Sequence, residues 1–97
     1  MQIARRMERE EVPPGRQVVR EGETGERFYL ILSGIFAVSQ EDLGPRRVLQ
    51  PGDYFGEVAL AMNVPRTASV RALTPAVVAS CDRETFDELL RPLFADD

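Results

Sequence analysis

The 97-residue chain contains no histidine and a single cysteine. Without histidine it cannot build hydrolytic triads that use histidine as the base, or the common imidazole metal sites. One cysteine, Cys81, also excludes an internal disulfide and a cysteine-cluster metal site. Cys81 ends the apolar run AVVASC, which predicts a small buried thiol. We therefore expect no catalytic residue, no metal site and no cofactor beyond a ligand.

Long apolar runs and basic surfaces are missing as well. No run approaches the ~18 apolar residues that a membrane span needs, and the N-terminal MQIARRMEREEV lacks the apolar region of a secretory signal. We therefore expect a cytoplasmic protein whose segment makes no membrane contact. The net charge of -4 argues against nucleic acid binding, which needs a basic face. The pairs Arg5 with Arg6 and Arg46 with Arg47 are expected to be solvated.

Length and pattern predict one mainly β domain over residues 1–97. Hydrophobic residues make up 43% of the chain, enough for one modest core. From about residue 12, short extended runs alternate with turn residues, as in an all-β sandwich or barrel. Strands are predicted at 28–32, 35–40, 68–73 and 76–81, and turns at 13–15, 21–26 and 41–45. The first two of these strands are expected to form a hairpin across Ser33 and Gly34, whereas Pro75 separates the last two.

Helices are predicted at three places. Residues 57–62 (EVALAM) are good helix formers between a glycine and Asn63. Residues 82–94 begin at the capping residue Asp82, and Pro92 should end or kink that helix or start another. Its apolar side chains follow helical spacing: Phe86, Leu89, Leu90 and Leu93. Residues 1–11 form a third, helical segment. The predicted architecture is an antiparallel, jelly-roll-like β-roll over 12–81 with short flanking α-helices.

Residues 52–70 (GDYFGEVALAMNVPRTASV) place one acid, Glu57, and one arginine, Arg66, around a short apolar turn. The Arg66 guanidinium is a planar fork that matches phosphate oxygens, and Pro65 stiffens the chain before it. Gly56 allows close backbone approach at the start of the short helix. A carboxylate such as Glu57 accepts hydrogen bonds from ribose hydroxyls. Small side chains leave room beside them, so the stretch would suit a compact phosphorylated ribose.

Simpler interpretations of this pair stay open on chemistry alone. An arginine after a proline in a loop is commonly a solvated surface residue. A glutamate at a helix start commonly serves as a favourable partner of the helix dipole. Glu57 and Arg66 could also pair with each other at the surface, which is worth ~0–1 kcal/mol.

The string FGEVALAMNVPRTASV resembles the phosphate-binding cassette of the cyclic-nucleotide-binding domain family. EGETGERFYLILSG is similar to the loop and strand that precede the cassette in that family, and CDRETFDELL to the helix after the roll. The resemblance covers roughly residues 12–94 and places the cassette at 52–70. The start of the last helix is most similar to modules of cyclic-nucleotide-dependent protein kinases and their regulatory subunits.

The resemblance implies a role for each matching residue. Glu57 would accept the ribose 2′-hydroxyl, with Gly56 against the sugar, and Arg66 would pair with the cyclic phosphate. Glu26 would act as a second-shell acid that orients the arginine, where relatives usually carry aspartate. Thr67 would either bond a guanine amino group or simply begin a strand. The implied ligand-binding set is Gly56, Glu57, Val58, Ala59, Arg66, Thr67 and Ala68, with backbone N–H groups near Ala59 and Thr67 completing the phosphate shell.

The predicted function is a regulatory module that is not an enzyme. It would bind a small-molecule cyclic nucleotide, cGMP or cAMP, and transmit binding to a kinase catalytic domain or another output domain, in cis or in trans. The alternatives are the corresponding domain of an ion channel or bacterial regulator, and a degenerate module that serves only as an interaction surface. A cupin-like metal-dependent dioxygenase is disfavoured by the missing histidines. The family's lid helix, which runs on from about Pro92, is expected to be truncated at Asp97.

Overall fold

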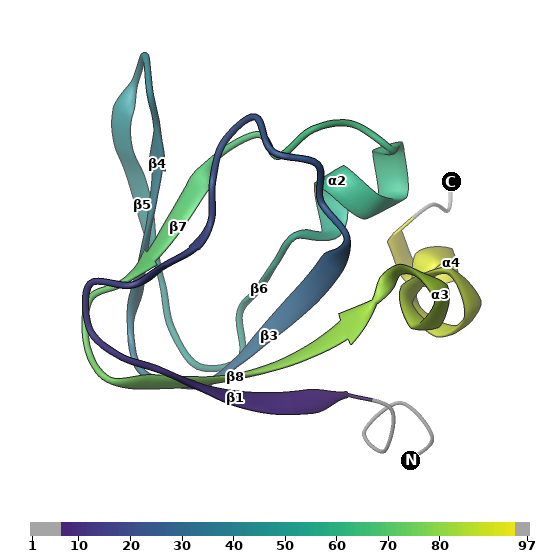
Figure 1. The fold of residues 1–97 in the computed structure, drawn as a ribbon, viewed down its shortest axis with the longest axis horizontal. Coiled ribbons are helices and arrows are strands. Elements are labelled where there is room, and N and C mark those ends of the chain that lie inside the picture. The colour runs from purple at the N-terminus through teal and green to yellow at the C-terminus, as the bar shows by residue number, and fades with distance from the viewer. Residues whose placement is uncertain (1–6, 95–97) are drawn as a thin grey trace.

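The computed structural model describes residues 7–94, which form a β-roll of two four-stranded antiparallel sheets (Figure 1). In spatial order the first sheet comprises β1 (Glu8–Val12), β8 (Ala76–Asp82), β3 (Arg27–Ser33) and β6 (Tyr54–Phe55). The second comprises β2 (Gln17–Val19), β7 (Ser69–Ala72), β4 (Phe36–Gln40) and β5 (Gly44–Leu49). The predicted mainly β, antiparallel fold is confirmed, and each of the four predicted strands is present.

The main core lies between the two sheets, because alternate residues of each strand point inward. Phe36, Ile31 and Val78 are fully buried there. Phe55 stacks on Tyr29 with 4.9 Å between ring centroids and also contacts Phe36 at 5.8 Å. This aromatic group fixes β6, a strand of only two residues, and so positions the chain that enters the cassette.

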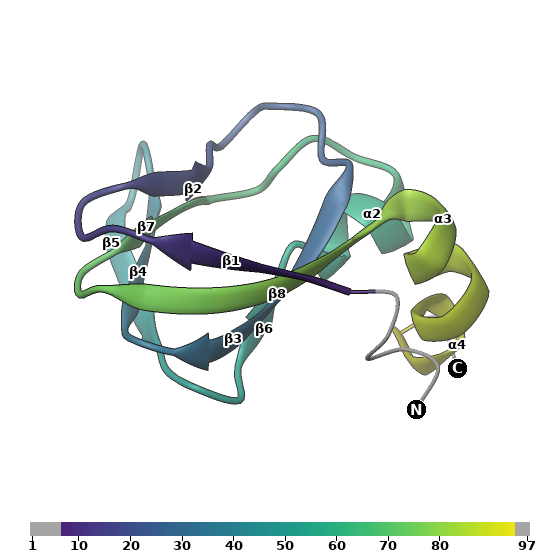
Figure 2. The ribbon, with the colours of Figure 1, turned by 60° about the horizontal axis from the view of Figure 1, so that its bottom comes forward.

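The helical elements lie together at one end of the roll (Figure 2). The cassette helix α2 spans Glu57–Met62, as predicted. The chain after β8 forms α3 (Arg83–Thr85), a π-helical turn η1 (Phe86–Leu90) and α4 (Arg91–Phe94). A second core joins these helices to the roll and consists of Phe28, Leu60, Cys81, Phe86 and Leu90. Cys81 is 1% exposed, which confirms the predicted buried thiol.

The C-terminal helical segment begins as predicted and continues past Pro92. The Asp82 side chain accepts a hydrogen bond from the Thr85 N–H at 2.9 Å, which is an N-cap. A proline in a continuous α-helix would clash with the carbonyl four residues earlier, here that of Glu88. The π turn η1 includes Glu88 and lies directly before α4. The wider turn thus accommodates Pro92 in the first turn of α4, which confirms the predicted alternative that Pro92 starts another helix.

The predicted hairpin of residues 28–32 with 35–40 is wrong. Strand β3 pairs with β8 and β6, whereas β4 pairs with β5 and β7 in the other sheet. Gly34 adopts φ +92°, and a Cβ there would lie 2.4 Å from the Ala76 Cβ. The glycine therefore lets the chain cross tightly between sheets where an ordinary hairpin turn was expected.

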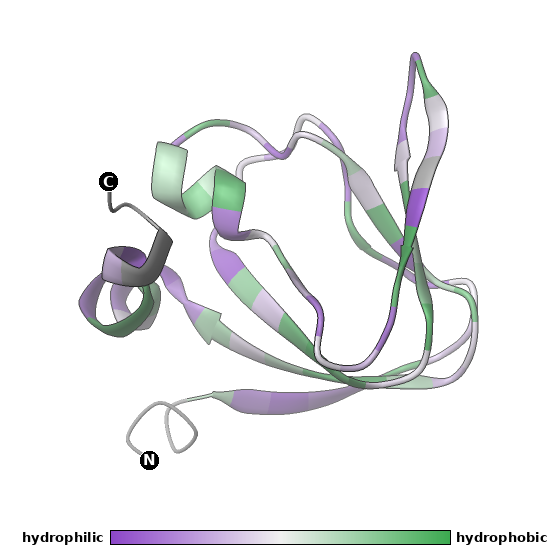
Figure 3. Ribbon diagram, turned by 180° about the vertical axis from the view of Figure 1, so that it is seen from behind, coloured by the Kyte–Doolittle hydropathy of each residue, from purple (hydrophilic) through white to green (hydrophobic). Residues whose placement is uncertain are grey.

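The predicted N-terminal helix is wrong from Glu8 onward, and residues 1–6 lie outside the described part of the chain. Residues Glu8–Val12 form the edge strand β1, which pairs along its length with β8. Glu8–Glu11 are exposed and Val12 is buried, and the strand is mostly coloured hydrophilic in Figure 3. Long-range pairing with β8 therefore overrides the local helical preference of this stretch.

Candidate functional site

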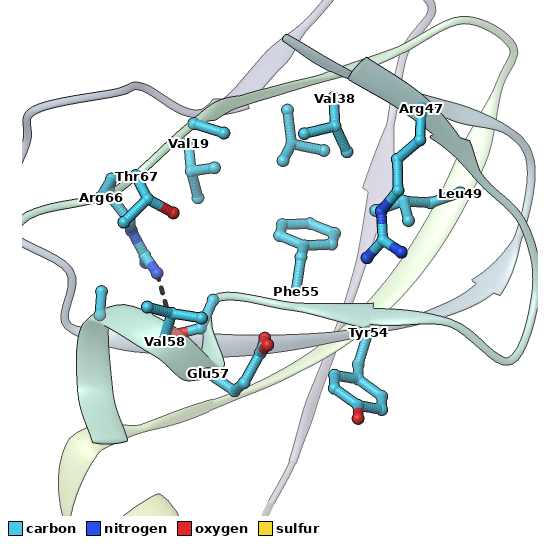
Figure 4. Close-up of a pocket in the computed structure, with 14 residues that line it drawn as sticks. Val19, Val38, Arg47, Leu49, Tyr54, Phe55, Glu57, Val58, Arg66 and Thr67 are labelled. Atoms are coloured by element: carbon cyan, nitrogen blue, oxygen red, sulfur yellow. Dashed lines mark hydrogen bonds between the residues drawn. The ribbon is translucent and has the colours of Figure 1, made fainter. Parts of the chain in front are cut away.

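A cavity of about 140 Å³ lies between the second sheet, the β6 strand and the first turn of α2 (Figure 4). Its floor is apolar and includes Phe55, Leu49 and Val70, which are buried. Its polar groups include Arg66, Glu57 and Thr67 on one side and Arg47 on the other. All seven residues of the predicted ligand-binding set line this cavity. The fold thus brings the predicted residues to one concave place.

Arg66 is a charged side chain that is buried in the site, with 8% of its surface exposed. Its Nη2 donates a hydrogen bond to the Arg27 carbonyl at 2.9 Å, and its Nη1 donates to the Gly56 carbonyl at 3.3 Å. Its backbone N–H donates to the Glu23 carbonyl at 2.8 Å. The expectation of a solvated arginine is therefore wrong. The guanidinium is held by backbone on both sides, which fixes its direction.

Close packing explains why glycines surround this arginine. A Cβ at Gly56, which has φ +96°, would lie 2.8 Å from the Arg27 carbonyl oxygen and 2.9 Å from Arg66 Nη1. A Cβ at Gly25 would lie 2.7 Å from the Ala59 Cβ and 2.8 Å from the guanidinium carbon of Arg66. Both glycines therefore supply the space in which the guanidinium sits.

Burial lowers the pKa of Arg66 by removing water from its charge. Tyr29 and the acidic residues Glu23, Glu26 and Glu57 act in the opposite direction through their charge. Within residues 7–94, however, no carboxylate lies within ion-pairing distance of Arg66. The alternative of a simple Glu57–Arg66 surface pair is therefore not found. Among the residues that the structure describes, the side chain of this buried cation is hydrogen-bonded only to neutral carbonyl oxygens.

The remaining predicted residues frame the opening of the cavity. Glu57 begins α2 and is half-buried, with its carboxylate directed toward the cavity in Figure 4. Val58 is exposed at the mouth, whereas Ala59 is buried against the Gly25 loop. The Thr67 hydroxyl points into the cavity, and the Thr67 carbonyl accepts a hydrogen bond from the Gln40 amide at 2.9 Å. Ala68 is half-buried beside it.

Glu26 does not contact the arginine that it was predicted to orient. Its carboxylate lies 3.5 Å from Nε of Arg83, at the start of α3, and its side chain is 64% exposed. Arg83 also donates a hydrogen bond to the Gly25 carbonyl at 3.1 Å. Glu26 and Arg83 together tie the 21–26 loop to the last helical segment. The effect of Glu26 on Arg66 is limited to its charge.

Two functional features were missed by the sequence analysis. Arg47 is exposed, as expected, but it also lines the cavity, and Figure 4 shows its guanidinium directed inward. The alternation of side chains along β5 could have indicated this position, because Arg47 and the buried Leu49 are two residues apart and so lie on the same face of the strand. Gly25 was predicted only as part of a loop. No local pattern distinguishes it from Gly22, whose added Cβ would meet nothing within 4 Å.

Two absences among the described residues bear on other functions. Between residues 7 and 94, no three or more histidine, cysteine, aspartate or glutamate side chains are grouped so that they could hold a metal ion. In the same part of the chain, no helix is long and apolar enough to span a membrane. The cavity itself places a guanidinium, a group that can bind an anion, beside a carboxylate, a group that can accept hydrogen bonds from hydroxyls, over an apolar floor.

The curated relatives are kinase regulatory subunits. The cAMP-dependent protein kinase regulatory subunit of Candida albicans is 48% identical over 79 residues, which are 81% of this chain and 17% of the subunit. That of Eremothecium gossypii is 44% identical over 94% of this chain and 20% of its own length. This chain thus spans about a fifth of the length of these relatives.

Solved structures agree with that similarity. The cAMP-bound PfPKA-R fragment 141–441 has a TM-score of 0.89 and 32% identity, over 94% of this chain and 32% of the fragment. The family model "Cyclic nucleotide-binding domain" matches residues 9–92. These matches confirm the resemblance inferred from the cassette string. The chain belongs to the cyclic nucleotide-binding domain family.

Proposed function

We propose that this cavity binds a cyclic nucleotide monophosphate, with the cyclic phosphate on Arg66 and the ribose 2′-hydroxyl on Glu57. The observation that carries the proposal is Arg66, which is 8% exposed and whose guanidinium, within the described part of the chain, is hydrogen-bonded only to the Gly56 and Arg27 carbonyls. A buried cation without an anionic partner is costly. A bound phosphate would supply that partner in a charge-assisted, two-oxygen geometry.

The cavity is large enough to enclose part of a cyclic nucleotide but not the whole molecule. Its volume of about 140 Å³ is below the ~300–1,000 Å³ of sites that enclose a drug-sized molecule. The polar end formed by Arg66 and Glu57 would hold the sugar and phosphate. The base would then lie toward the open side, over the apolar floor and near Arg47 and Thr67. Closure over the base would need a further element.

The proposed role is regulatory, because the relatives are regulatory subunits of a protein kinase. Binding would pull on α2, which packs against the C-terminal helices through Leu60, Phe86 and Leu90. Movement of those helices would then transmit binding to a kinase catalytic domain in cis or in trans. We also propose a cytoplasmic location and no cofactor other than the ligand.

Isothermal titration with cAMP tests the binding proposal, with guanosine as a nucleoside that lacks the phosphate. The regulatory subunit of a cAMP-independent protein kinase A from Trypanosoma cruzi, a structural relative with a TM-score of 0.85 and 31% identity over 95% of this chain and 34% of that one, was solved with guanosine bound. Wild type should bind cAMP, and Arg66→Gln should weaken that binding by about 2–4 kcal/mol. Guanosine binding, if any, should not change in Arg66→Gln.

The matched control is Arg71→Gln, which removes an exposed arginine on β7 that donates to the Gly15 carbonyl. Its cAMP affinity should equal that of wild type. Absence of a binding signal in wild type at millimolar cAMP and cGMP would contradict the proposal. Equal losses for cAMP and guanosine in Arg66→Gln would show that the arginine does not act on a phosphate.

A second candidate ligand, cGMP, is favoured by two side chains at the open side. The Thr67 hydroxyl and the Arg47 guanidinium both point into the cavity (Figure 4). An arginine fork can bond the O6 and N7 acceptors of guanine, and adenine offers no such pair. Thr67→Ala should lower cGMP affinity alone if the hydroxyl bonds the guanine amino group. Unchanged affinity for both nucleotides would show that Thr67 does not read the base and serves only in the chain that leads into β7.

A further inference from the structure

The short helix α2 ends in carbonyl groups that have no hydrogen-bond donor within the helix itself. The last four carbonyls of any α-helix lack an intrahelical donor. The Ala59 carbonyl accepts from the backbone N–H groups of Asn63 and Val64, the latter at 3.2 Å. In a continuing helix the Ala61 carbonyl would accept from residue 65, but Pro65 has no N–H. The turn after α2 therefore leaves carbonyls that need donors from elsewhere.

Arg91 supplies those donors from the start of α4, thirty residues later in the sequence. Its Nη1 donates to the Ala61 carbonyl at 2.8 Å, and its Nη2 donates to the Leu60 carbonyl at 2.7 Å. The fork thus engages two successive carbonyls, a geometry that a single ammonium group cannot reproduce. Its positive charge also lies at the negative end of the α2 dipole. The contact therefore ties the end of α2 to the C-terminal helices.

The position of the Arg91 side chain is itself fixed. Its Nε donates to the Asp87 carboxylate at 2.9 Å, and its guanidinium lies 5.9 Å from the centre of the Phe86 ring. Its backbone N–H donates to the Phe86 carbonyl and closes the π turn. The turn that accommodates Pro92 therefore also sets where Arg91 points. The interaction is built from fixed groups on both sides.

We propose that Arg91 is a positioning residue for ligand binding, which rests on the function proposed above. Helix α2 has six residues and is therefore about 9 Å long at 1.5 Å per residue. A displacement of its last turn would therefore also move its first turn. Its first turn supplies Glu57 to the cavity and follows Gly56, whose carbonyl holds Arg66. By holding the last turn of α2, Arg91 keeps Glu57 and the Gly56 carbonyl aligned with the Arg66 guanidinium.

Hydrogen exchange on the ligand-free chain tests the contact without assuming any ligand. Arg91→Met keeps the apolar stem and removes the donors. Amides in the last turn of α2 should then exchange about 2- to 30-fold faster, the effect expected from removing a cation at a helix C-terminus. Amides of the paired strands β3 and β8 should not change. Arg9→Met, which removes an exposed arginine on β1, is the charge-matched control and should match wild type at α2.

Titration with cAMP tests the positioning role. Arg91→Met should bind about 5- to 10-fold more weakly, at the low end of typical coupling between sites. Arg91→Lys should recover part of that loss, because it restores the charge and one donor. Asp87→Ala should lose less affinity than Arg91→Met, because it removes one group that fixes Arg91 but leaves the two donors to the α2 carbonyls in place.

Four outcomes would overturn the proposal. The first is unchanged α2 exchange and unchanged affinity in Arg91→Met. The second is faster exchange throughout the chain, which would indicate a loss of general stability. The third is an equal effect in Asp87→Ala, which would assign the role to the ion pair. The fourth is changed α2 exchange with wild-type cAMP affinity. If wild type itself binds no cyclic nucleotide, the proposed function fails, and unchanged α2 exchange in Arg91→Met would separately refute the contact.

Discussion

Replacement of Gly25 by alanine should disturb the phosphate site through packing alone. Gly25 does not have a positive φ, so its backbone conformation is open to alanine. The added Cβ would lie 2.7 Å from the Ala59 Cβ and 2.8 Å from Cζ and Nε of Arg66, where ordinary contacts begin at 3.4 Å. Ala59 belongs to α2, and two backbone carbonyls hold the Arg66 guanidinium, so neither neighbour can yield freely. Overpacking of this kind costs about 1–3 kcal/mol.

The same displacement should weaken ligand binding. A shift that breaks one charged hydrogen bond to a phosphate would cost about 1.5–3 kcal/mol, or roughly 10- to 150-fold in affinity. The assay is urea unfolding for stability together with cAMP titration. Gly15→Ala is the control: its φ of +86° makes alanine strained, but its Cβ would meet nothing within 4 Å. That variant should lose about 1–2 kcal/mol of stability and keep wild-type affinity. Wild-type affinity in Gly25→Ala would refute the reasoning.

Three further predictions concern other elements. Gly34→Ala should lower the free energy of unfolding by about 2–5 kcal/mol in urea titration, because it combines a positive φ with a Cβ 2.4 Å from that of Ala76; a loss below 1 kcal/mol would contradict the tight crossing. Asp82→Ala should cost about 1 kcal/mol of unfolding free energy, because the Thr85 N–H loses its cap, and an unchanged urea midpoint would argue against that cap. Arg47→Gln should weaken cGMP binding more than cAMP binding, by about 1 kcal/mol in paired titrations, and equal losses would exclude a role in reading the base.

The sequence predicted local features of the fold well because they depend on neighbouring residues. Strand alternation, turn residues and the helix-forming run at 57–62 are all short-range signals, and α2 occupies those residues. The order FGE, small apolar helix, then PR identified the family. The predicted helix at 1–11 is wrong from Glu8 onward because the structure of that stretch depends on residues far away in the sequence. Its charged residues carry no trace of the β8 partner about 70 positions later.

Strand pairing and burial were decided only by the tertiary structure. The β3 strand could have paired with its neighbour in sequence, but Arg27 pairs with Asp82 across the sheet instead. Such pairing depends on which apolar faces can be buried together, and a local window does not contain that information. For the same reason Arg47 could not be separated from solvated arginines until β5 was placed over the cavity.

The sequence by itself determined the main residue types of the site, because an arginine fork, a carboxylate and the glycine before it have fixed chemistry wherever they lie. The tertiary structure decided what those residues do. It buries Arg66 among backbone carbonyls, turns Glu26 toward Arg83, and brings Arg91 to the end of α2. Each of these facts joins segments far apart in the chain. Only the folded arrangement of two sheets and the helices at one end of them places those segments in contact.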